Sequence, residues 1–356
     1  MTLKNIFISG ETGSGKTVIA LGLALKLREL GLKVGYFKPV DSAKGFQRQR
    51  GEDVALLKEV LSLVHEPVVL SPIQTGPYYL GGGQRREQEA LKEKIKTAWQ
   101  IAKENFDTLL IEGSLSPYTA ASLGIDAISL AKLLDAAMLY VIRPENDYDL
   151  DKTIFANNYF RLEGLTVLGN IFNNVERTLL DKTKGIYAPI LEEQRYPVLG
   201  IIPSKAEIAS PNVQQFHDTL GGELLTNEGI GLERTVEEVV VGSMTIESAL
   251  SYLRRAPNKA VITGGDRSDI ALTALETSTS VLILTGGLYP DVGVLNRAIE
   301  KNVPVILVHY DTFTAIERLH EISHRIHPGD EQGVRIAREN IINYCNWQAI
   351  VEYLSP

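Results

Sequence analysis

The sequence of 356 residues contains a single cysteine, Cys345. One thiol can form neither an intramolecular disulfide nor a cluster of thiolate metal ligands. Free cysteine is among the most buried residue types, so we expect Cys345 to be a core residue near the C-terminus.

Long apolar runs are also missing. The longest mostly apolar stretch, from Ala127 to Ile142, is interrupted by Lys132 and Asp135, which excludes a membrane span. The apolar segment Ile6-Phe7-Ile8 is too short for the hydrophobic region of a signal peptide. We therefore expect neither a membrane partner nor export.

No strong basic stripe offsets the net charge of −8, so we expect no nonspecific binding to nucleic acid. No nucleophile–base pair of the Ser/His/Asp kind can be recognised. The remaining composition, 44% apolar and 22% charged residues, is typical of a globular protein long enough for two domains.

The strongest motif reads GETGSGKT and fits the pattern G-x-x-x-x-G-K-[ST] at every fixed position. Its residues are Gly10, Glu11, Thr12, Gly13, Ser14, Gly15, Lys16 and Thr17. An apolar run precedes it and a helical pattern, Val18 to Leu30, follows it. In that setting backbone N–H groups surround phosphate oxygens, Lys16 reaches the β- and γ-phosphates, and the Thr17 hydroxyl binds Mg²⁺. The alternative is a glycine-rich turn that holds no ligand.

Strand and helix patterns alternate over the first 205 residues, which predicts an α/β fold with a doubly wound, mostly parallel sheet. The expected strands are Asn5–Ser9, Val34–Val40, Val68–Leu70, Thr108–Ile111, Ala137–Ile142, Leu165–Phe172 and Val198–Ile202. A second, smaller α/β unit follows, with expected strands Val239–Val241, Lys259–Ile262, Val281–Leu284 and Val305–Val308. We expect a nucleotide-binding domain over residues 1–205 and a second domain over residues 206–356.

Two acids and a lysine lie where a phosphate site needs them. Glu112 follows the strand that ends at Ile111, and an acid at the carboxyl end of such a strand could hold Mg²⁺ or orient a water. A capping or salt-bridged glutamate is the alternative. Asp53 is a second candidate metal ligand or the N-cap of a helix. Lys38, held extended by Pro39, would face a phosphate or be a solvated lysine.

Together these residues resemble the dethiobiotin synthetase and cobyrinic acid amidase branch of P-loop proteins, over about residues 3–205. Besides the phosphate loop and Asp53, the resemblance is carried by Gly35-Tyr36-Phe37-Lys38-Pro39-Val40, Ile111-Glu112-Gly113, Gly169-Asn170-Ile171-Phe172-Asn173 and Leu199-Gly200-Ile201-Ile202-Pro203. It implies ATP and Mg²⁺ as cofactors and Lys16, Lys38 and Glu112 as catalytic residues. It also implies that Asp53 and Glu112 hold Mg²⁺. Asn173 would hydrogen-bond the adenine base, and Pro203 would pack near it.

Two features depart from dethiobiotin synthetases. The phosphate loop is one residue shorter, and Ser114-Leu115-Ser116-Pro117 stands where those enzymes have a glycine-rich turn that meets the substrate. The resemblance therefore carries over better for the nucleotide half of the site than for the substrate half.

The second unit resembles the DRTGG domain. The resemblance is carried by Asp266-Arg267, Thr285-Gly286-Gly287 and Asp311-Thr312, each following an apolar strand. Such groups at strand ends could bind a small anionic metabolite or a nucleotide. Structural turns and a dimer contact are the alternative.

Both domains in this order resemble the N-terminal portion of long bacterial phosphate acetyltransferases. With no room after them for an acetyl-transfer domain, we expect no phosphate acetyltransferase activity. The resemblance implies a cytoplasmic, weakly hydrolysing ATP-binding regulatory protein, a homodimer or higher oligomer, whose DRTGG domain senses a ligand or mediates dimerisation. The alternative is an ATP-dependent C–N ligase that activates a carboxylate or carbamate through an acyl phosphate.

Overall fold

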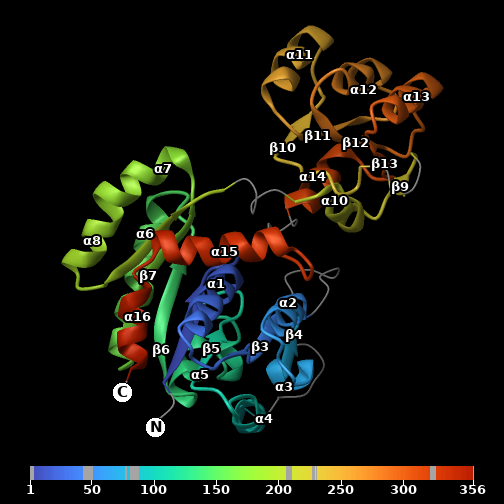
Figure 1. Ribbon diagram of the computed structural model, residues 1–356. Helices are drawn as coiled ribbons and strands as arrows, with labels where there is room; N and C mark the ends of the chain where they lie inside the picture. The colour runs from blue at the N-terminus through green and yellow to red at the C-terminus, as the bar shows by residue number, and fades with distance from the viewer. Residues whose placement is uncertain are drawn as a thin grey trace. The chain divides into compact units, whose positions relative to one another are not determined.

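The computed structural model describes residues 4–42, 51–76, 78–80, 88–205, 211–226, 229, 231–320 and 326–355. The chain divides into two compact units, Met1–Lys205 with Ile326–Pro356, and Ala206–Arg325 (Figure 1). We expected the second domain to extend from 206 to 356. That expectation is corrected at its C-terminal end, because the last segment packs into the first unit.

Six parallel strands form the main sheet in the described part of the first unit, in the order β2-β5-β1-β6-β7-β8. They are β1 (Asn5–Gly10), β2 (Val34–Phe37), β5 (Thr108–Glu112), β6 (Ala136–Ile142), β7 (Val167–Val175) and β8 (Val198–Pro203). The strands β1, β2, β5 and β6 are buried along their whole length, as expected of parallel strands covered on both faces. The α/β fold with a parallel central sheet is confirmed.

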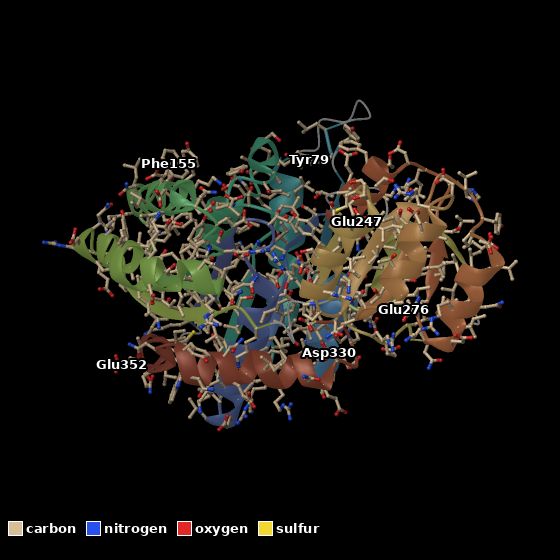
Figure 2. All side chains as sticks on the ribbon, turned by 90° about the horizontal axis from the view of Figure 1, so that it is seen from above. Tyr79, Phe155, Glu247, Glu276, Asp330 and Glu352 are labelled. Atoms are coloured by element: carbon tan, nitrogen blue, oxygen red, sulfur yellow. The ribbon has the colours of Figure 1, made fainter. Side chains whose placement is uncertain are left out.

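Helices connect these strands. They are α1 (Lys16–Glu29), α2 (Glu52–Val60), α4 (Gln88–Ala102), α5 (Ala127–Leu133), α6 (Asp147–Leu162), α7 (Arg177–Lys182) and α8 (Ala188–Glu193). The ring of Phe155 on α6 lies at the surface and is 75% exposed (Figure 2). No helix within the described residues is both long and apolar enough to cross a membrane.

Two expectations for strands are wrong. The segment Val68–Leu70 belongs to a one-turn helix, α3 (Pro67–Leu70), which begins at the proline because that residue suits the first helical position. The expected strand Val34–Val40 is divided into β2 and β3 (Val40–Ser42), since Pro39 has no N–H to continue the ladder. β3 instead pairs in parallel with β4 (Ile73–Thr75), outside the main sheet.

The C-terminal segment packs on the helix that follows the phosphate loop. Its helices are α15 (Glu331–Tyr344) and α16 (Trp347–Leu354), and α15 lies against α1 (Figure 1). A Cβ on Gly22 would come within 2.4 Å of the carbonyl oxygen of Ala337, so glycine permits this close approach. At the end of α1, Glu29 forms an ion pair of 2.7 Å with Arg338. The packing of the C-terminal segment onto the first unit therefore depends on a small residue in α1.

Cys345 lies between these two helices and is 8% exposed, which confirms the expected core position. Its backbone pairs with that of Gly200 in β8 as an isolated antiparallel β-bridge. Burial raises the pKa of its thiol to about 12, so the sulfur stays protonated and chemically inert near neutral pH.

In its described part, the second unit is a five-stranded sheet in the order β10-β11-β12-β13-β9, antiparallel only at β9. The strands are β9 (Glu223–Leu224), β10 (Glu238–Val241), β11 (Lys259–Gly264), β12 (Thr279–Thr285) and β13 (Val305–Leu307). Apolar side chains of α11 (Ile246–Arg255), α12 (Ser268–Leu275) and α13 (Val292–Glu300) form one core cluster with the sheet. Those of α10 (Val213–Leu220) and α14 (Thr312–His320) form another. Alternate strand residues enter the two clusters, as the period of a strand requires.

Candidate functional site

Glycines shape the loop between β1 and α1. Gly10, Gly13 and Gly15 have φ angles of 153°, 79° and 88°, which favour glycine. A Cβ on Gly15 would lie 2.1 Å from the side-chain nitrogen of Asn173, and one on Gly10 would lie 2.2 Å from the carbonyl oxygen of Val141. The loop is thus packed tightly against the ends of β6 and β7, and it leads into the positive end of the α1 dipole.

Polar groups of Ser14 and Thr12 stabilise the phosphate loop, and one hydroxyl stays unpaired in the part of the chain that the structure describes. The backbone N–H of Ser14 donates to the carbonyl of Glu11 at 3.2 Å, and the Thr12 hydroxyl donates to the carbonyl of Leu115 at 3.0 Å. The buried Ser14 hydroxyl has no hydrogen-bond partner among the described residues. An unpaired buried hydroxyl in this loop fits a phosphate oxygen as its missing partner.

Lys16 curls back over its own loop. Its ammonium donates to the carbonyl oxygens of Gly10, at 2.8 Å, and Glu11, at 2.9 Å, and the residue is buried. Burial lowers the pKa of Lys16 to about 8, which the negative charge of Glu112 only partly opposes. Lys16 is therefore a poorly solvated cation held by neutral oxygens, ready to exchange them for an anion.

We expect nucleotide affinity to fall with rising pH because of this lysine. Above about pH 8 the nucleotide-free protein loses the proton of Lys16, whereas Lys16 stays protonated in the complex because the polyphosphate is negatively charged. The Kd for ATP should then rise about 15-fold in all between pH 8 and 9.5, as measured by calorimetry at constant ionic strength. A Kd that stays constant from pH 7 to 9.5 would contradict this assignment.

Glu112 ends β5 directly beside Ile8 of β1, which brings it next to the phosphate loop. Its Oε1 accepts from the Thr17 hydroxyl at 3.0 Å, and its Oε2 accepts from the Tyr36 hydroxyl at 2.8 Å. Burial, followed by the charge of Glu112, raises the pKa of Tyr36 well above its ordinary value, so the phenol remains a donor. The carboxylate of Glu112 is therefore fixed at both oxygens.

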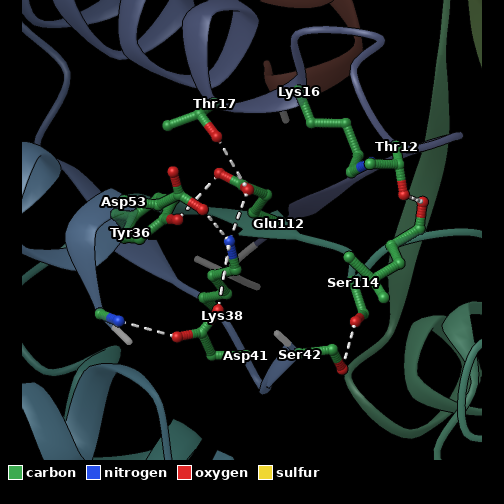
Figure 3. A network of polar contacts seen from close by, with 12 residues as sticks. Thr12, Lys16, Thr17, Tyr36, Lys38, Asp41, Ser42, Asp53, Glu112 and Ser114 are labelled. Atoms are coloured by element: carbon green, nitrogen blue, oxygen red, sulfur yellow. Dashed lines mark hydrogen bonds and ion pairs between the residues drawn. The ribbon is translucent and has the colours of Figure 1, made fainter. Parts of the chain in front are cut away.

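Lys38 connects the acids (Figure 3). Its ammonium forms ion pairs with Asp53 and with Glu112 Oε1, the latter at 2.9 Å, and lies 3.8 Å from Asp41. Burial alone would lower the pKa of Lys38, but the charges of these carboxylates outweigh it and raise the pKa above its ordinary value. The residue is 4% exposed, so the alternative of a solvated lysine is wrong.

Two of the three expected metal ligands, Asp53 and Glu112, bind this ammonium group, and the third, Thr17, is hydrogen-bonded to Glu112. Asp53 lies in the first turn of α2, whose N-cap is Gly51, so the alternative of an N-cap aspartate is wrong. Carboxylate and hydroxyl oxygens are ligands that Mg²⁺ accepts, and the two carboxylates already bind a cation here. No group of three or more His, Cys, Asp or Glu side chains among the described residues could hold a metal by itself. The donor set therefore fits Mg²⁺ completed by nucleotide phosphates, which is how proteins often hold this ion.

The two expected base contacts lie on neighbouring strands. Asn173 of β7 is buried, and its side-chain amide donates to the carbonyl of Ser14 at 2.8 Å. It thus braces the phosphate loop, a contact that we did not expect from the sequence. Pro203 ends β8 opposite Val175 and is partly buried.

Sequence reasoning missed several polar side chains of this cluster. Tyr36 lies within the segment Gly35–Val40 that was already singled out, and Asp41 directly follows that segment. A hydroxyl cluster was also missed. Ser114 donates to Ser42 at 2.7 Å (Figure 3), and Ser42 is also hydrogen-bonded to Thr75. These hydroxyls come from three separate segments, so no local pattern could have revealed them.

In the second unit, the expected turns meet at the carboxyl ends of the parallel strands. The hydroxyls of Thr285 and Thr312 lie 2.8 Å apart, and Gly286 and Gly287 follow in left-handed conformations. The guanidinium of Arg267 is paired with Asp269 at 3.0 Å. The polar side chains named here satisfy one another, so this geometry alone assigns no ligand.

Comparison with protein families matches residues 4–212 to a model described as an AAA domain and residues 215–322 to the DRTGG domain. The first match spans more than half of the chain. The chain is 28% identical over 354 residues to a phosphate acetyltransferase of Pseudomonas putida, covering 94% of this chain and 50% of that protein. It is 30% identical over 208 residues to an ATP-dependent dethiobiotin synthetase of Methanococcus vannielii, covering 57% of this chain and 94% of that protein.

These matches confirm the resemblance to a P-loop domain followed by a DRTGG domain. The chain spans about half the length of the phosphate acetyltransferases that it matches. Among solved structures, the septum site-determining protein MinD of Pyrococcus horikoshii, complexed with Mg-ADP, matches with 18% identity and a TM-score of 0.35. That match covers 58% of this chain and 84% of MinD, a likeness too small to support a functional argument.

Proposed function

The chain belongs to the AAA domain family of P-loop proteins, and on this premise we propose that it is a Mg²⁺-dependent, weakly hydrolysing ATP-binding regulatory protein. The observation that carries the proposal is the convergence of Lys16, Thr17, Lys38, Asp53 and Glu112 in one polar cluster at the phosphate loop. Our proposal includes a cytoplasmic location and a homodimer or higher oligomer. The DRTGG domain over residues 206–325 would bind a small anionic metabolite or mediate dimerisation.

In this proposal each residue keeps a distinct role. The loop amides and Lys16 bind the phosphates, while Thr17, Asp53 and Glu112 hold Mg²⁺. When bound, the metal neutralises charge on the phosphate oxygens. Asn173 selects adenine with the part of its side chain that the phosphate loop does not use, and Pro203 packs near the base.

A second function is favoured by one observation. Ser42, Thr75 and Ser114 place linked hydroxyls beside the acids, where a second substrate would have to be positioned. The proposed alternative is therefore an ATP-dependent ligase that activates a carboxylate or carbamate as an acyl phosphate. Lys38 would then stabilise charge on the transferring phosphoryl group.

Thermal unfolding with ATP or GTP, with and without Mg²⁺, tests the proposed binding. We expect ATP with Mg²⁺ to stabilise most, GTP to stabilise less, and chelation of the metal to reduce the effect of ATP. Greater stabilisation by GTP would reject the adenine preference, and an absence of stabilisation by either nucleotide would reject the site.

Measuring phosphate release then separates the two functions. A ligase should release phosphate at least about tenfold faster when its carboxylate or amine substrate is added, whereas slow release that no such substrate stimulates favours the regulatory protein.

A further inference from the structure

Lys38 holds a position that a divalent cation would need. Its ammonium binds Asp53 and Glu112, the two carboxylates of the proposed magnesium site. On Glu112 it binds Oε1 at 2.9 Å, the same oxygen that accepts from the Thr17 hydroxyl at 3.0 Å. The other oxygen of Glu112 is bound by Tyr36. A cation ligated by Thr17 and Glu112 therefore has to take or share the oxygen that Lys38 binds.

Asp41 offers this ammonium a third partner. One of its oxygens lies 3.8 Å from Lys38 Nζ, and the other accepts from the N–H of Gly51 at 2.9 Å. Gly51 is the N-cap of α2, whose first turn carries Asp53. In the view of Figure 3, Asp41 lies on one side of the Lys38 ammonium, and Glu112 and Thr17 lie on the other. The same turn therefore fixes Asp41 and positions Asp53.

We propose that Lys38 is a tethered counter-ion that competes with Mg²⁺ for Asp53 and Glu112, and that Asp41 receives its ammonium when the divalent cation takes those carboxylates. The inference rests on the magnesium site of the proposed function. It adds an order of events, because the single charge of Lys38 already offsets part of the charge of the two acids in the absence of nucleotide. Nucleotide phosphates bring further negative charge to these side chains and favour the exchange. Metal is thus bound with nucleotide rather than before it.

Binding of Mn²⁺ alone, followed by electron paramagnetic resonance and by competition with Mg²⁺, tests the competition. In nucleotide-free protein, Lys38→Met should bind Mn²⁺ at least about tenfold more tightly than wild type, because the two carboxylates lose their internal cation. Lys38→Gln, which can still donate a hydrogen bond, should do the same and serves if the methionine variant does not fold. Lys33→Met, at an exposed lysine, is the matched control and should leave the affinity unchanged.

The role of Asp41 is tested by a double-mutant cycle. Asp41→Asn keeps an acceptor for the N–H of Gly51 but removes the charge, so it should weaken Mn²⁺ binding about threefold to tenfold. In the Lys38→Met background the same substitution should have a much smaller effect, because no ammonium remains to be received. An equal effect in both backgrounds would mean that Asp41 attracts the metal directly, and would overturn its assigned role. Asp151→Asn, on the exposed side of α6, is the control for the loss of an acidic charge.

The outcomes separate this inference from the function on which it rests. If wild type binds Mn²⁺ with ATP but neither Lys38 variant binds it more tightly without nucleotide, only the competition is overturned. If wild type binds no Mn²⁺ even with ATP, the proposed magnesium site fails, and the competition fails with it.

Discussion

Replacing Lys16 with methionine is expected to abolish the stabilisation that ATP gives to the wild-type protein, while leaving the nucleotide-free protein no less stable. A single-site binder gains about 2.7 kcal/mol when its ligand is present at 100 times the Kd. Loss of a buried cation that faces a phosphate weakens binding on the order of 100-fold, which removes nearly all of that gain. The measurement is thermal unfolding with and without ATP and Mg²⁺.

The nucleotide-free protein should tolerate the change because Lys16 is a costly residue. Its ammonium is buried against the carbonyls of Gly10 and Glu11 and has no direct ion pair with a carboxylate in the described part of the chain. The pKa is about 8 in the folded protein, against an ordinary value of 10.5, so the folded state binds fewer protons between these pH values. Stability of the wild type should therefore rise with pH across this window, and the Lys16→Met variant should lack that rise.

Lys33→Met is again the matched control, since Lys33 is exposed and lies outside the loop. It should show the full stabilisation by ATP. Stabilisation of Lys16→Met equal to that of wild type would contradict the nucleotide site.

Most of the candidate nucleotide site could be predicted from sequence because its parts obey local rules. The glycine spacing fixes the phosphate loop between β1 and α1, and an acid after a buried strand has to lie at the carboxyl edge of the sheet. Lys38 and Asp53 were candidates from their positions and received their roles from the resemblance, and the structure brings both to Glu112.

The parts that could not be predicted depend on contacts between distant segments. The C-terminal segment packs on α1 because Gly22 leaves room for the backbone at Ala337. A single glycine inside a helical pattern does not indicate which segment will pack against it. The pairing of β3 with β4 places Ser42 next to Thr75. The sequence pattern predicted one continuous strand across Pro39 and did not show that the strand is divided there. Asn173 braces Ser14 through a contact spanning 159 residues, so its position beside the phosphate loop is a property of the sheet order.

Replacing Lys38 with methionine should have the opposite effect on the nucleotide-free protein and destabilise it strongly. Lys38 and Lys16 are both buried, but Lys38 forms ion pairs with Asp53 and Glu112, which are buried themselves. Removing one partner of a buried ion pair leaves uncompensated charge and costs about 3–5 kcal/mol. The raised pKa of Lys38 means that it is fully charged from pH 6 to 9, so the loss should be nearly independent of pH over that range.

Urea unfolding of the nucleotide-free variants measures this difference, with Lys33→Met expected to stay within about 0.5 kcal/mol of wild type. Saturating Mg²⁺ should restore part of the stability lost in Lys38→Met, because a divalent cation can neutralise the same two carboxylates, and it should do little for Lys16→Met. If both variants lost the same stability, and Mg²⁺ restored neither, then Lys38 would act as a packing residue and its charge would not be what holds the acids together. A single comparison of free energies of unfolding therefore distinguishes the role of Lys38, which is paired with carboxylates, from that of Lys16, which is paired with carbonyls.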